Sequence, residues 1–292
     1  MQCTLCPRAC GVERNMNMRG FCGAPDEPRI ARAALHAWEE PVISGKCGSG
    51  TVFFSGCNLR CVFCQNHAVS HDALGRPVTE EELADVFLSL QEQGAHNINL
   101  VTPSHYAHVL RRVLEAIKPR LSIPVVWNSG GYETVETLRS LKGLVDIYLP
   151  DVKYYSSELS AAYSAASDYF PIAMEALAEM LRQQPECIFD ENGLLLRGTI
   201  VRHLILPGCR EDSIALLRAL AERFGTKGYL LSLMSQYTPD FASDCAYKNL
   251  HRKLTTFEYR SVQEEAMRLG FDGFSQSPAS ASADFTPQFS GN

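Results

Sequence analysis

The sequence has no long apolar run and no basic run. Nowhere do 18 consecutive apolar residues occur, and the opening residues MQCTLCPRAC lack the apolar core of a signal peptide. Lys and Arg number 27 against 33 Asp and Glu, a net charge of −6, which argues against a dedicated nucleic-acid binder because such proteins depend on basic residues facing phosphates. We therefore expect a cytoplasmic protein that binds neither membranes nor nucleic acids.

What the sequence has in surplus is cysteine. Hydrophobic residues at 46% and charged residues at 21% are typical of a globular protein, and 292 residues suffice for one α/β barrel or two smaller domains. In a reducing cytosol, 11 cysteines do not persist as structural disulfides. The surplus therefore indicates metal binding or redox chemistry.

One group of cysteines forms a C-x3-C-x2-C triplet. At the cysteine frequency of this chain, such a triplet is expected by chance about 0.015 times. Three thiolates, from Cys57, Cys61 and Cys64, can hold an iron–sulfur cluster and leave one iron without a protein ligand. Zinc is the alternative, with His67 or His71 as the fourth ligand.

A second group has the spacing C-x2-C-x3-C-x11-C. Its members are Cys3, Cys6, Cys10 and Cys22. Four thiolates are enough to close a structural site around zinc or a second iron–sulfur cluster, and a merely structural Cys-rich segment remains the other interpretation. The remaining cysteines are interpreted as ordinary core or surface thiols: Cys47, Cys187, Cys209 and Cys245.

Apolar runs alternate with segments of helical periodicity. Strands are predicted at 51–55, 97–101, 123–127, 145–149, 199–206 and 229–233. Helices are predicted from 79 to Gly94, with Thr79 and Glu82 as a capping box, and at 107–118, 134–141, 171–182, 213–223 and 255–269. This alternation predicts a parallel sheet with right-handed crossovers. The Ser-, Ala- and Pro-rich tail 275–292 is predicted to be disordered, with Phe285 and Phe289 as possible anchors.

Beyond the triplet, several longer stretches resemble one family. GSGTVFFSGCNLRCVFCQN, NINLVTPSHY, VDIYLPDVKYY, IVRHLILPG and LMSQYTP resemble the radical S-adenosylmethionine (SAM) superfamily, specifically its PflX-type branch, homologues of the pyruvate formate-lyase activating enzyme. With the six βα units, the resemblance implies an α/β fold: a partial, TIM-like (βα)6 barrel at 47–274, open on one side, between a Cys-rich N-terminal module at 1–46 and the tail. In such barrels the loops after the strands hold the chemistry, and the triplet follows the first strand.

The resemblance also implies cofactors and a reaction. Cys57, Cys61 and Cys64 would hold a [4Fe–4S] cluster whose open iron is chelated by SAM, and reductive cleavage of SAM would yield a 5′-deoxyadenosyl radical that abstracts hydrogen. The implied partners are an electron donor such as flavodoxin or ferredoxin and, for an activase, a glycine in a protein substrate. The alternatives are radical modification of another peptide or a small metabolite, and a non-catalytic iron–sulfur or zinc metalloprotein.

The resemblance further implies where SAM binds. Phe63 resembles the residue whose backbone lies against adenine. Activating enzymes carry Gly-Gly-Glu after the second strand, whereas this chain has Thr102 and Ser104 there, whose hydroxyls could substitute. Gly130-Gly131-Tyr132-Glu133 has similar letters but follows the third strand, so we reject it as the amino-group site. Asn128, just before it, is predicted near ribose or substrate.

The later strands add four candidates. Asp151 and Lys153 match an Asp-x-Lys motif, and alternation places both on one face of an extended segment, where Lys153 can neutralise the SAM carboxylate. Either Arg202 or His203 must point inward from an apolar strand, and we favour Arg202. Gln236 is predicted to complete the adenine or substrate pocket. Four other histidines are interpreted as ordinary: His36, His96, His108 and His251.

Overall fold

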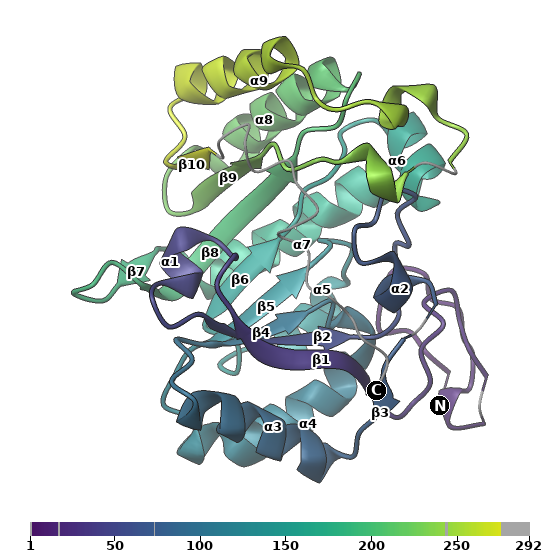
Figure 1. The fold of residues 1–292 in the computed structure, drawn as a ribbon, viewed down its shortest axis with the longest axis vertical. Coiled ribbons are helices and arrows are strands. Elements are labelled where there is room, and N and C mark those ends of the chain that lie inside the picture. The colour runs from purple at the N-terminus through teal and green to yellow at the C-terminus, as the bar shows by residue number, and fades with distance from the viewer. Residues whose placement is uncertain (1, 17, 73, 243–244, 276–292) are drawn as a thin grey trace.

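A curved, mostly parallel sheet forms the centre of the molecule (Figure 1). The computed structural model describes residues 2–16, 18–72, 74–242 and 245–275. Within these ranges ten strands are joined in the order β10-β9-β8-β6-β5-β4-β2-β1-β3, with β7 on the edge of β8. Their bounds are Arg29–His36 (β1), Ser49–Phe54 (β2), Arg76–Pro77 (β3), Ile98–Val101 (β4), Val125–Ser129 (β5), Ile147–Pro150 (β6), Ile188–Phe189 (β7), Leu195–Leu204 (β8), Leu230–Met234 (β9) and Gly273–Ser275 (β10).

The predicted partial barrel is confirmed. Strands β2, β4, β5, β6, β8 and β9 run parallel in chain order, so their carboxyl ends share one edge. Strand β10 extends the sheet in parallel beyond β9, and β1 pairs antiparallel with β2 on the other side. In the part of the chain that the structure describes, no pairing joins β10 to β1 or β3, so the barrel is open between them.

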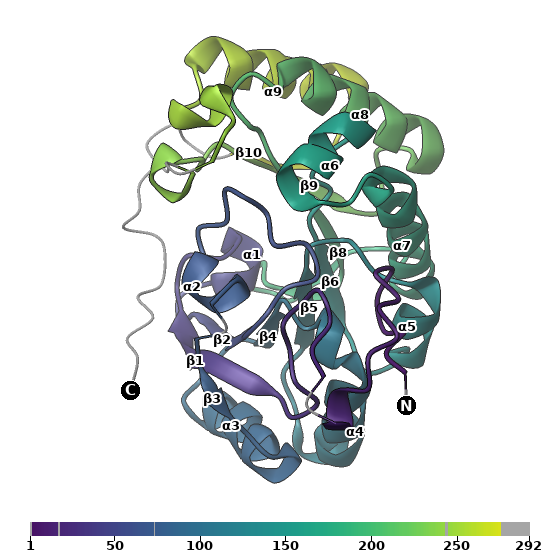
Figure 2. The same cartoon turned by 90° about the vertical axis from the view of Figure 1, so that its right-hand side faces the viewer.

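Most of the helices cover the outer surface of the curved sheet (Figure 2). Their bounds are Pro41–Ser44 (α1), His67–Ser70 (α2), Glu80–Glu92 (α3), Ala107–Ile117 (α4), Val135–Ser140 (α5), Ser157–Ser164 (α6), Tyr169–Gln183 (α7), Arg210–Phe224 (α8) and Thr256–Leu269 (α9). Helix α3 begins at the predicted capping box, in which Thr79 Oγ1 accepts from the Glu82 N–H and Glu82 accepts from the Thr79 N–H. None of the helices in the described ranges is long and apolar enough to cross a membrane.

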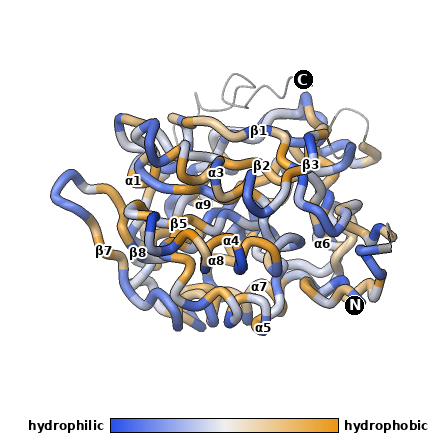
Figure 3. The backbone as a smooth tube through the Cα atoms, turned by 90° about the horizontal axis from the view of Figure 1, so that it is seen from below, coloured by the Kyte–Doolittle hydropathy of each residue, from blue (hydrophilic) through white to orange (hydrophobic). Residues whose placement is uncertain are grey.

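Two apolar layers result from the alternation of side chains along the strands. Outward-facing residues such as Phe54, Leu100 and Trp127 pack against α3, α4, α5 and α7. Inward-facing Val126, Leu149 and Ile200 pack instead against Ile43 of α1. Because α1 follows β1, which runs antiparallel, it closes the barrel end opposite the carboxyl ends of the strands. Figure 3 shows the hydrophobic strands crossing the interior, whereas the β7–β8 connection is hydrophilic at its tip.

The structure moves several predicted boundaries. The strands predicted at 123–127 and 145–149 extend instead over Val125–Ser129 and Ile147–Pro150, because they continue beyond the apolar run into polar residues and a proline. Sequence reasoning also missed β1, α6 and β10. Strand β1 begins at Arg29, contains Arg32 and is only half-buried, so it carries no clear apolar pattern. Phe285 and Phe289 lie outside the described residues.

Candidate functional site

The cysteine triplet lies on the loop that follows β2. The Cys57 N–H donates to the Cys22 carbonyl at 3.3 Å, and the Cys64 N–H donates to the Cys61 carbonyl at 3.1 Å. Gly56 has a φ of 89° and passes so close to Cys22 that a Cβ would lie 2.6 Å from the Cys22 oxygen. The loop is therefore fixed against the N-terminal module at the point where the triplet begins.

Each of the three sulfurs accepts a hydrogen bond. Cys57 Sγ accepts from the Leu59 N–H at 3.4 Å, Cys61 Sγ from Ser164 Oγ at 3.0 Å and Cys64 Sγ from Ser70 Oγ at 3.3 Å. Burial raises the pKa of the Cys57 thiol to about 12, with the neighbouring Cys61 adding to the effect, and burial also raises the pKa of Cys64. Buried thiols whose negative charges would repel one another lose their protons readily only when they bind a cation, such as the iron of a cluster.

The surroundings of the triplet favour a cluster over zinc. In the described ranges no three His, Cys, Asp or Glu side chains are arranged to hold a metal ion. A tetrahedral zinc ion would need the thiolates and a histidine at about 2.0–2.3 Å from one point, whereas a cluster binds each thiolate through a different iron. Both ring nitrogens of His71 are engaged, by Ser70 Oγ at 2.8 Å and by the Arg60 carbonyl at 3.1 Å. The donor set therefore fits a cluster held by three thiolates.

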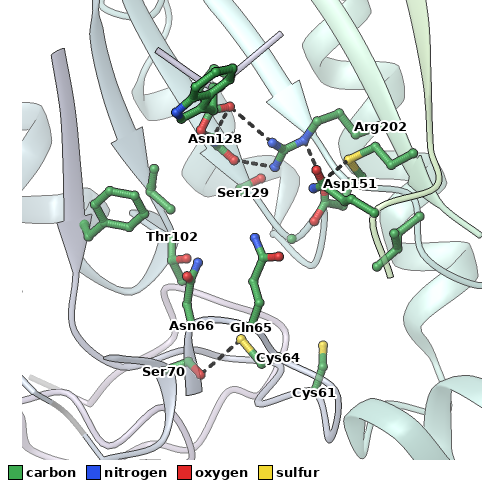
Figure 4. Close-up of a pocket in the computed structure, with 18 of the residues that line it drawn as sticks. Cys61, Cys64, Gln65, Asn66, Ser70, Thr102, Asn128, Ser129, Asp151 and Arg202 are labelled. Atoms are coloured by element: carbon green, nitrogen blue, oxygen red, sulfur yellow. Dashed lines mark hydrogen bonds and ion pairs between the residues drawn. The ribbon is translucent and has the colours of Figure 1, made fainter. Parts of the chain in front are cut away.

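A cavity of about 730 Å³ opens beside the triplet (Figure 4). In the close-up, Cys61 and Cys64 lie across it from Asn128 and Arg202. The predicted site residues that line it are Cys57, Cys61, Phe63, Cys64, Thr102, Asn128, Asp151, Lys153, Arg202 and Gln236. The structure thus brings together residues from six loops and strands that sequence reasoning assigned to one site.

Charged side chains form a network on the cavity wall. Asp151 Oδ2 accepts from Lys153 Nζ at 2.5 Å, and Asp151 Oδ1 accepts from Arg202 Nε at 2.9 Å. Arg202 Nη2 also donates to Asn128 Oδ1 at 2.6 Å. Burial alone would raise the pKa of Asp151, but the two cations outweigh it and hold that pKa below its ordinary value. Burial would lower the pKa of Lys153, whereas Asp151 and Cys61 raise it, so Lys153 is charged at neutral pH.

Alternation along β8 separates Arg202 from His203. The Arg202 side chain lines the cavity, as predicted. The buried His203 turns to the outer face, where Nδ1 lies 2.7 Å from the Val152 carbonyl and Nε2 lies 2.8 Å from Ser213 Oγ. Burial lowers the pKa of His203, so the ring is neutral. His203 therefore joins the sheet to α8 and has no contact with the cavity.

Ser104 does not lie where sequence reasoning placed it. It is buried and is not among the described residues that line the cavity, because its hydroxyl donates to Glu133 Oε1 at 2.8 Å. Glu133 also accepts from Trp127 Nε1 and from Ser129 Oγ, both at 2.6 Å. The hydroxyl predicted to bind SAM thus stabilises a buried carboxyl. The same contacts turn the Glu133 carboxyl of the Gly130–Glu133 stretch into the protein interior, away from the cavity that Gly130 lines.

Sequence reasoning missed the far end of the cavity. Trp38, Glu39 and Glu40 line it from the β1–α1 connection, with His36 beside them. Arg202 Nη1 lies 3.4 Å from Glu39 Oε2, and Ser232 Oγ donates to Glu40 Oε1 at 2.9 Å. Burial raises the pKa of Glu40 and lowers that of His36, which sequence reasoning interpreted as an ordinary histidine. In the sequence, the adjacent acidic residues Glu39 and Glu40 before Pro41 were the one signal that this segment could contribute to a site.

The N-terminal cysteines lie against the same loop. Cys6 and Cys22 are buried, Cys3 is partly buried and Cys10 is exposed. Burial raises the pKa of Cys6 to about 11 and also raises that of Cys22, although the backbone N–H groups of Arg8 and Ala24 partly offset the effect. These thiols are close enough to disfavour one another's ionisation, although the described side chains include no ready single-ion site.

Comparison with known proteins gives one family model and one long relative. The model described as the Radical SAM superfamily matches residues 51–191. An uncharacterized protein from Methanocaldococcus jannaschii is 30% identical over 281 residues, which cover 92% of this chain and 75% of that protein. The matched region of the family model begins in β2 and contains the cysteine triplet and the Asp151–Lys153 pair.

A solved structure of a methyltransferase shares the fold, and a second solved structure gives a weaker match. A radical SAM methyltransferase from Sphaerobacter thermophilus superposes with a TM-score of 0.53 at 15% identity, over 78% of this chain and 66% of that one. A domain of the pyruvate-formate lyase-activating enzyme from Bacteroides vulgatus matches with a TM-score of 0.43 at 9% identity, over 59% of this chain and 92% of that domain. By the first of these matches, this chain spans just under two thirds of the length of the methyltransferase.

Proposed function

The chain belongs to the radical SAM superfamily, and we propose that it is a PflX-type activating enzyme that takes a hydrogen atom from a glycine of a partner protein. In this superfamily a [4Fe–4S] cluster and SAM supply the 5′-deoxyadenosyl radical. The observation that supports the proposal is that Cys57, Cys61 and Cys64 share one cavity with the Asp151–Lys153 pair.

The cysteine loop would hold the cluster. Its three sulfurs face one cavity and each accepts a hydrogen bond, an environment that suits thiolate ligands. With no fourth cysteine on this loop, one iron would stay open toward the cavity and toward SAM. The loop itself is buried beneath the N-terminal module, which keeps water from one side of the site.

The cavity wall would bind SAM. Lys153 is charged and lies close enough to the triplet for Cys61 to raise its pKa, and it can pair with the SAM carboxylate. Thr102 has a φ of 57°, a strained conformation for a β-branched residue, and its N–H donates to the Asn128 carbonyl at 2.8 Å. That hydrogen bond fixes the loop after β4 where Thr102 lines the cavity. Phe63 and Gln236 would complete the adenine side, and Asn128 and Arg202 the ribose or substrate side.

The same cavity favours a second candidate, radical chemistry on another peptide or a small metabolite. Its far end carries Glu39 and Arg202, which can bind charged groups as well as a glycine loop. Both candidates need an electron from a donor such as flavodoxin or ferredoxin. They differ in the source of the hydrogen atom that the radical abstracts, a protein glycine in the first candidate and another peptide or a metabolite in the second.

The first experiment is anaerobic cluster reconstitution followed by dithionite and SAM, with an assay for 5′-deoxyadenosine. Cys61→Ala should lose both the cluster and SAM cleavage, whereas the exposed Cys47→Ala should retain them. A wild-type cluster that is intact and reducible but forms no 5′-deoxyadenosine would leave a non-catalytic metalloprotein as the function. For the activase, a glycyl-radical EPR signal should appear in a candidate partner after turnover, whereas transfer of deuterium from a deuterated metabolite to 5′-deoxyadenosine would favour the second candidate.

A further inference from the structure

The Cys61 sulfur receives its hydrogen bond from a residue far along the chain. Ser164 is the last residue of α6, and its Oγ donates to Cys61 Sγ at 3.0 Å. Ser164 Oγ also lies 2.7 Å from the Tyr154 hydroxyl. A serine hydroxyl has a single hydrogen, so when that hydrogen is given to sulfur, Tyr154 must be the donor in the second bond. Tyr154 and Ser164 thus form one directed chain of donors that ends on the Cys61 sulfur.

The N-terminal module holds this chain of donors in place. Arg8 Nη2 donates to the Ser164 carbonyl at 2.8 Å, and Nη1 donates to the Ala165 carbonyl. The same guanidinium donates through Nε to the Asn58 carbonyl at 2.9 Å, within the cysteine loop, and lies over the Phe21 ring at 3.8 Å. Arg8 therefore satisfies carbonyls at the end of α6 and fixes that end relative to the cysteine loop.

The backbone at this helix end is unusual. Ala165 caps α6 in the left-handed conformation, with a φ of 48°, which an alanine adopts only when its surroundings impose it. The two carbonyls that Arg8 binds, those of Ser164 and of Ala165 itself, lie on either side of the Ala165 Cα. Ser164 and Tyr154 are each 1% exposed, so water does not compete for the Cys61 sulfur from this side.

We propose that Ser164, oriented by Tyr154 and positioned by Arg8, raises the reduction potential of the cluster that Cys61 would ligate. The inference rests on the proposed function only in that it needs the cluster. Reduction adds one electron, here from dithionite, and increases the negative charge on the ligand sulfurs. A buried hydroxyl donor stabilises the reduced form more than the oxidised form. Donation from Tyr154 strengthens the Ser164 bond by polarising its hydroxyl.

The experiment is a redox titration of the reconstituted full-length protein, followed by EPR in the absence of SAM. Ser164→Ala should lower the ratio of reduced to oxidised cluster about tenfold at a fixed solution potential, a shift of about 59 mV for a one-electron couple. Ser160→Ala is the matched control, because Ser160 is buried on the same helix and its hydroxyl binds the Ser157 carbonyl instead. Its potential should equal that of the wild type.

Two further variants separate tuning from a structural effect. Ser164→Thr keeps a hydroxyl and should restore the wild-type potential, whereas Arg8→Ala should lower it by less than Ser164→Ala. A Ser164→Ala protein with full iron content and the wild-type potential would overturn the proposal. If Ser164→Ala does not retain iron, Tyr154→Phe decides, since a wild-type potential there also overturns it. A wild-type chain that assembles no reducible cluster would refute the proposed function instead.

Discussion

Replacing Asp151 by asparagine tests the charged network of the cavity. Asp151 is the shared acceptor of Lys153 at 2.5 Å and Arg202 at 2.9 Å, and the three side chains are only 15–17% exposed. The substitution preserves shape but leaves two partly desolvated cations without their common anion. Removing one member of a buried ion pair costs about 3–5 kcal/mol. At about 2–4 °C of melting temperature per kcal/mol, Asp151→Asn should melt at least roughly 6 °C below the wild type.

The assay is calorimetric melting of wild-type and variant protein at equal iron content. Lys153→Met removes the opposite charge. The loss of unfolding free energy in the double variant should be smaller than the sum of the losses in the two single variants by more than about 1 kcal/mol. A melting temperature of Asp151→Asn within 1–2 °C of the wild type, with strictly additive effects in the double variant, would refute the reasoning that these charges stabilise one another.

The same network predicts the direction of a pH effect. Arg202 and Lys153 outweigh burial and hold the pKa of Asp151 below its ordinary 3.8 in the folded protein. The stabilisation is therefore fully present above the pKa of the unfolded chain and is lost as the pH falls through the folded pKa. The difference in stability between wild type and Asp151→Asn should stay constant from pH 8 to about pH 5 and shrink below about pH 3.8.

Three shorter predictions concern the cofactor and the N-terminal module. Lys153→Ala should weaken SAM binding about tenfold by loss of one charge-assisted contact, whereas Lys118→Ala, on a surface pair with Asp146, should leave equilibrium binding unchanged. Gly56→Ala should lower the iron bound per chain, because its Cβ would meet the Cys22 carbonyl; Gly94→Ala, at an equally positive φ of 87° but with open space around it, should keep its iron. If the N-terminal cysteines bind metal, elemental analysis of the wild type should find zinc or iron in addition to the triplet cluster, and Cys22→Ser should remove this additional metal. Equal metal contents in wild type and Cys22→Ser would refute the N-terminal site.

The parts of the site that follow strand periodicity could be predicted from the sequence. A strand alternates its faces, so in an apolar run containing Arg202 and His203 only one can face the barrel, and the structure places Arg202 there. Asp151 and Lys153, two residues apart, likewise share a face. These predictions used only local spacing, which the backbone of a strand fixes whatever lies around it.

Predictions about loops depended on partners that spacing does not reveal. Ser104 was assigned to SAM because its hydroxyl follows a barrel strand, but a buried carboxylate 29 residues later takes that hydroxyl. Glu39 reaches the cavity by a contact with Arg202 across 163 positions. In each case the decisive partner comes from a distant segment, so neither hydropathy nor a motif could have identified it.

The two cysteine groups, separate in the sequence, belong to one assembly in space. The Cys22 carbonyl accepts from the Cys57 N–H, and the Cys6 sulfur interacts with the Asn58 side chain, so thiols of the N-terminal module border the first turn of the triplet loop. Arg8, between Cys6 and Cys10, binds the carbonyl of Asn58 and the helix end that carries Ser164. A change in the state of the N-terminal cysteines, such as metal binding or loss, should therefore reach Cys57 and Cys61 through these contacts. Iron retention by the triplet is thus a measure of the module's integrity as well as of its own ligands.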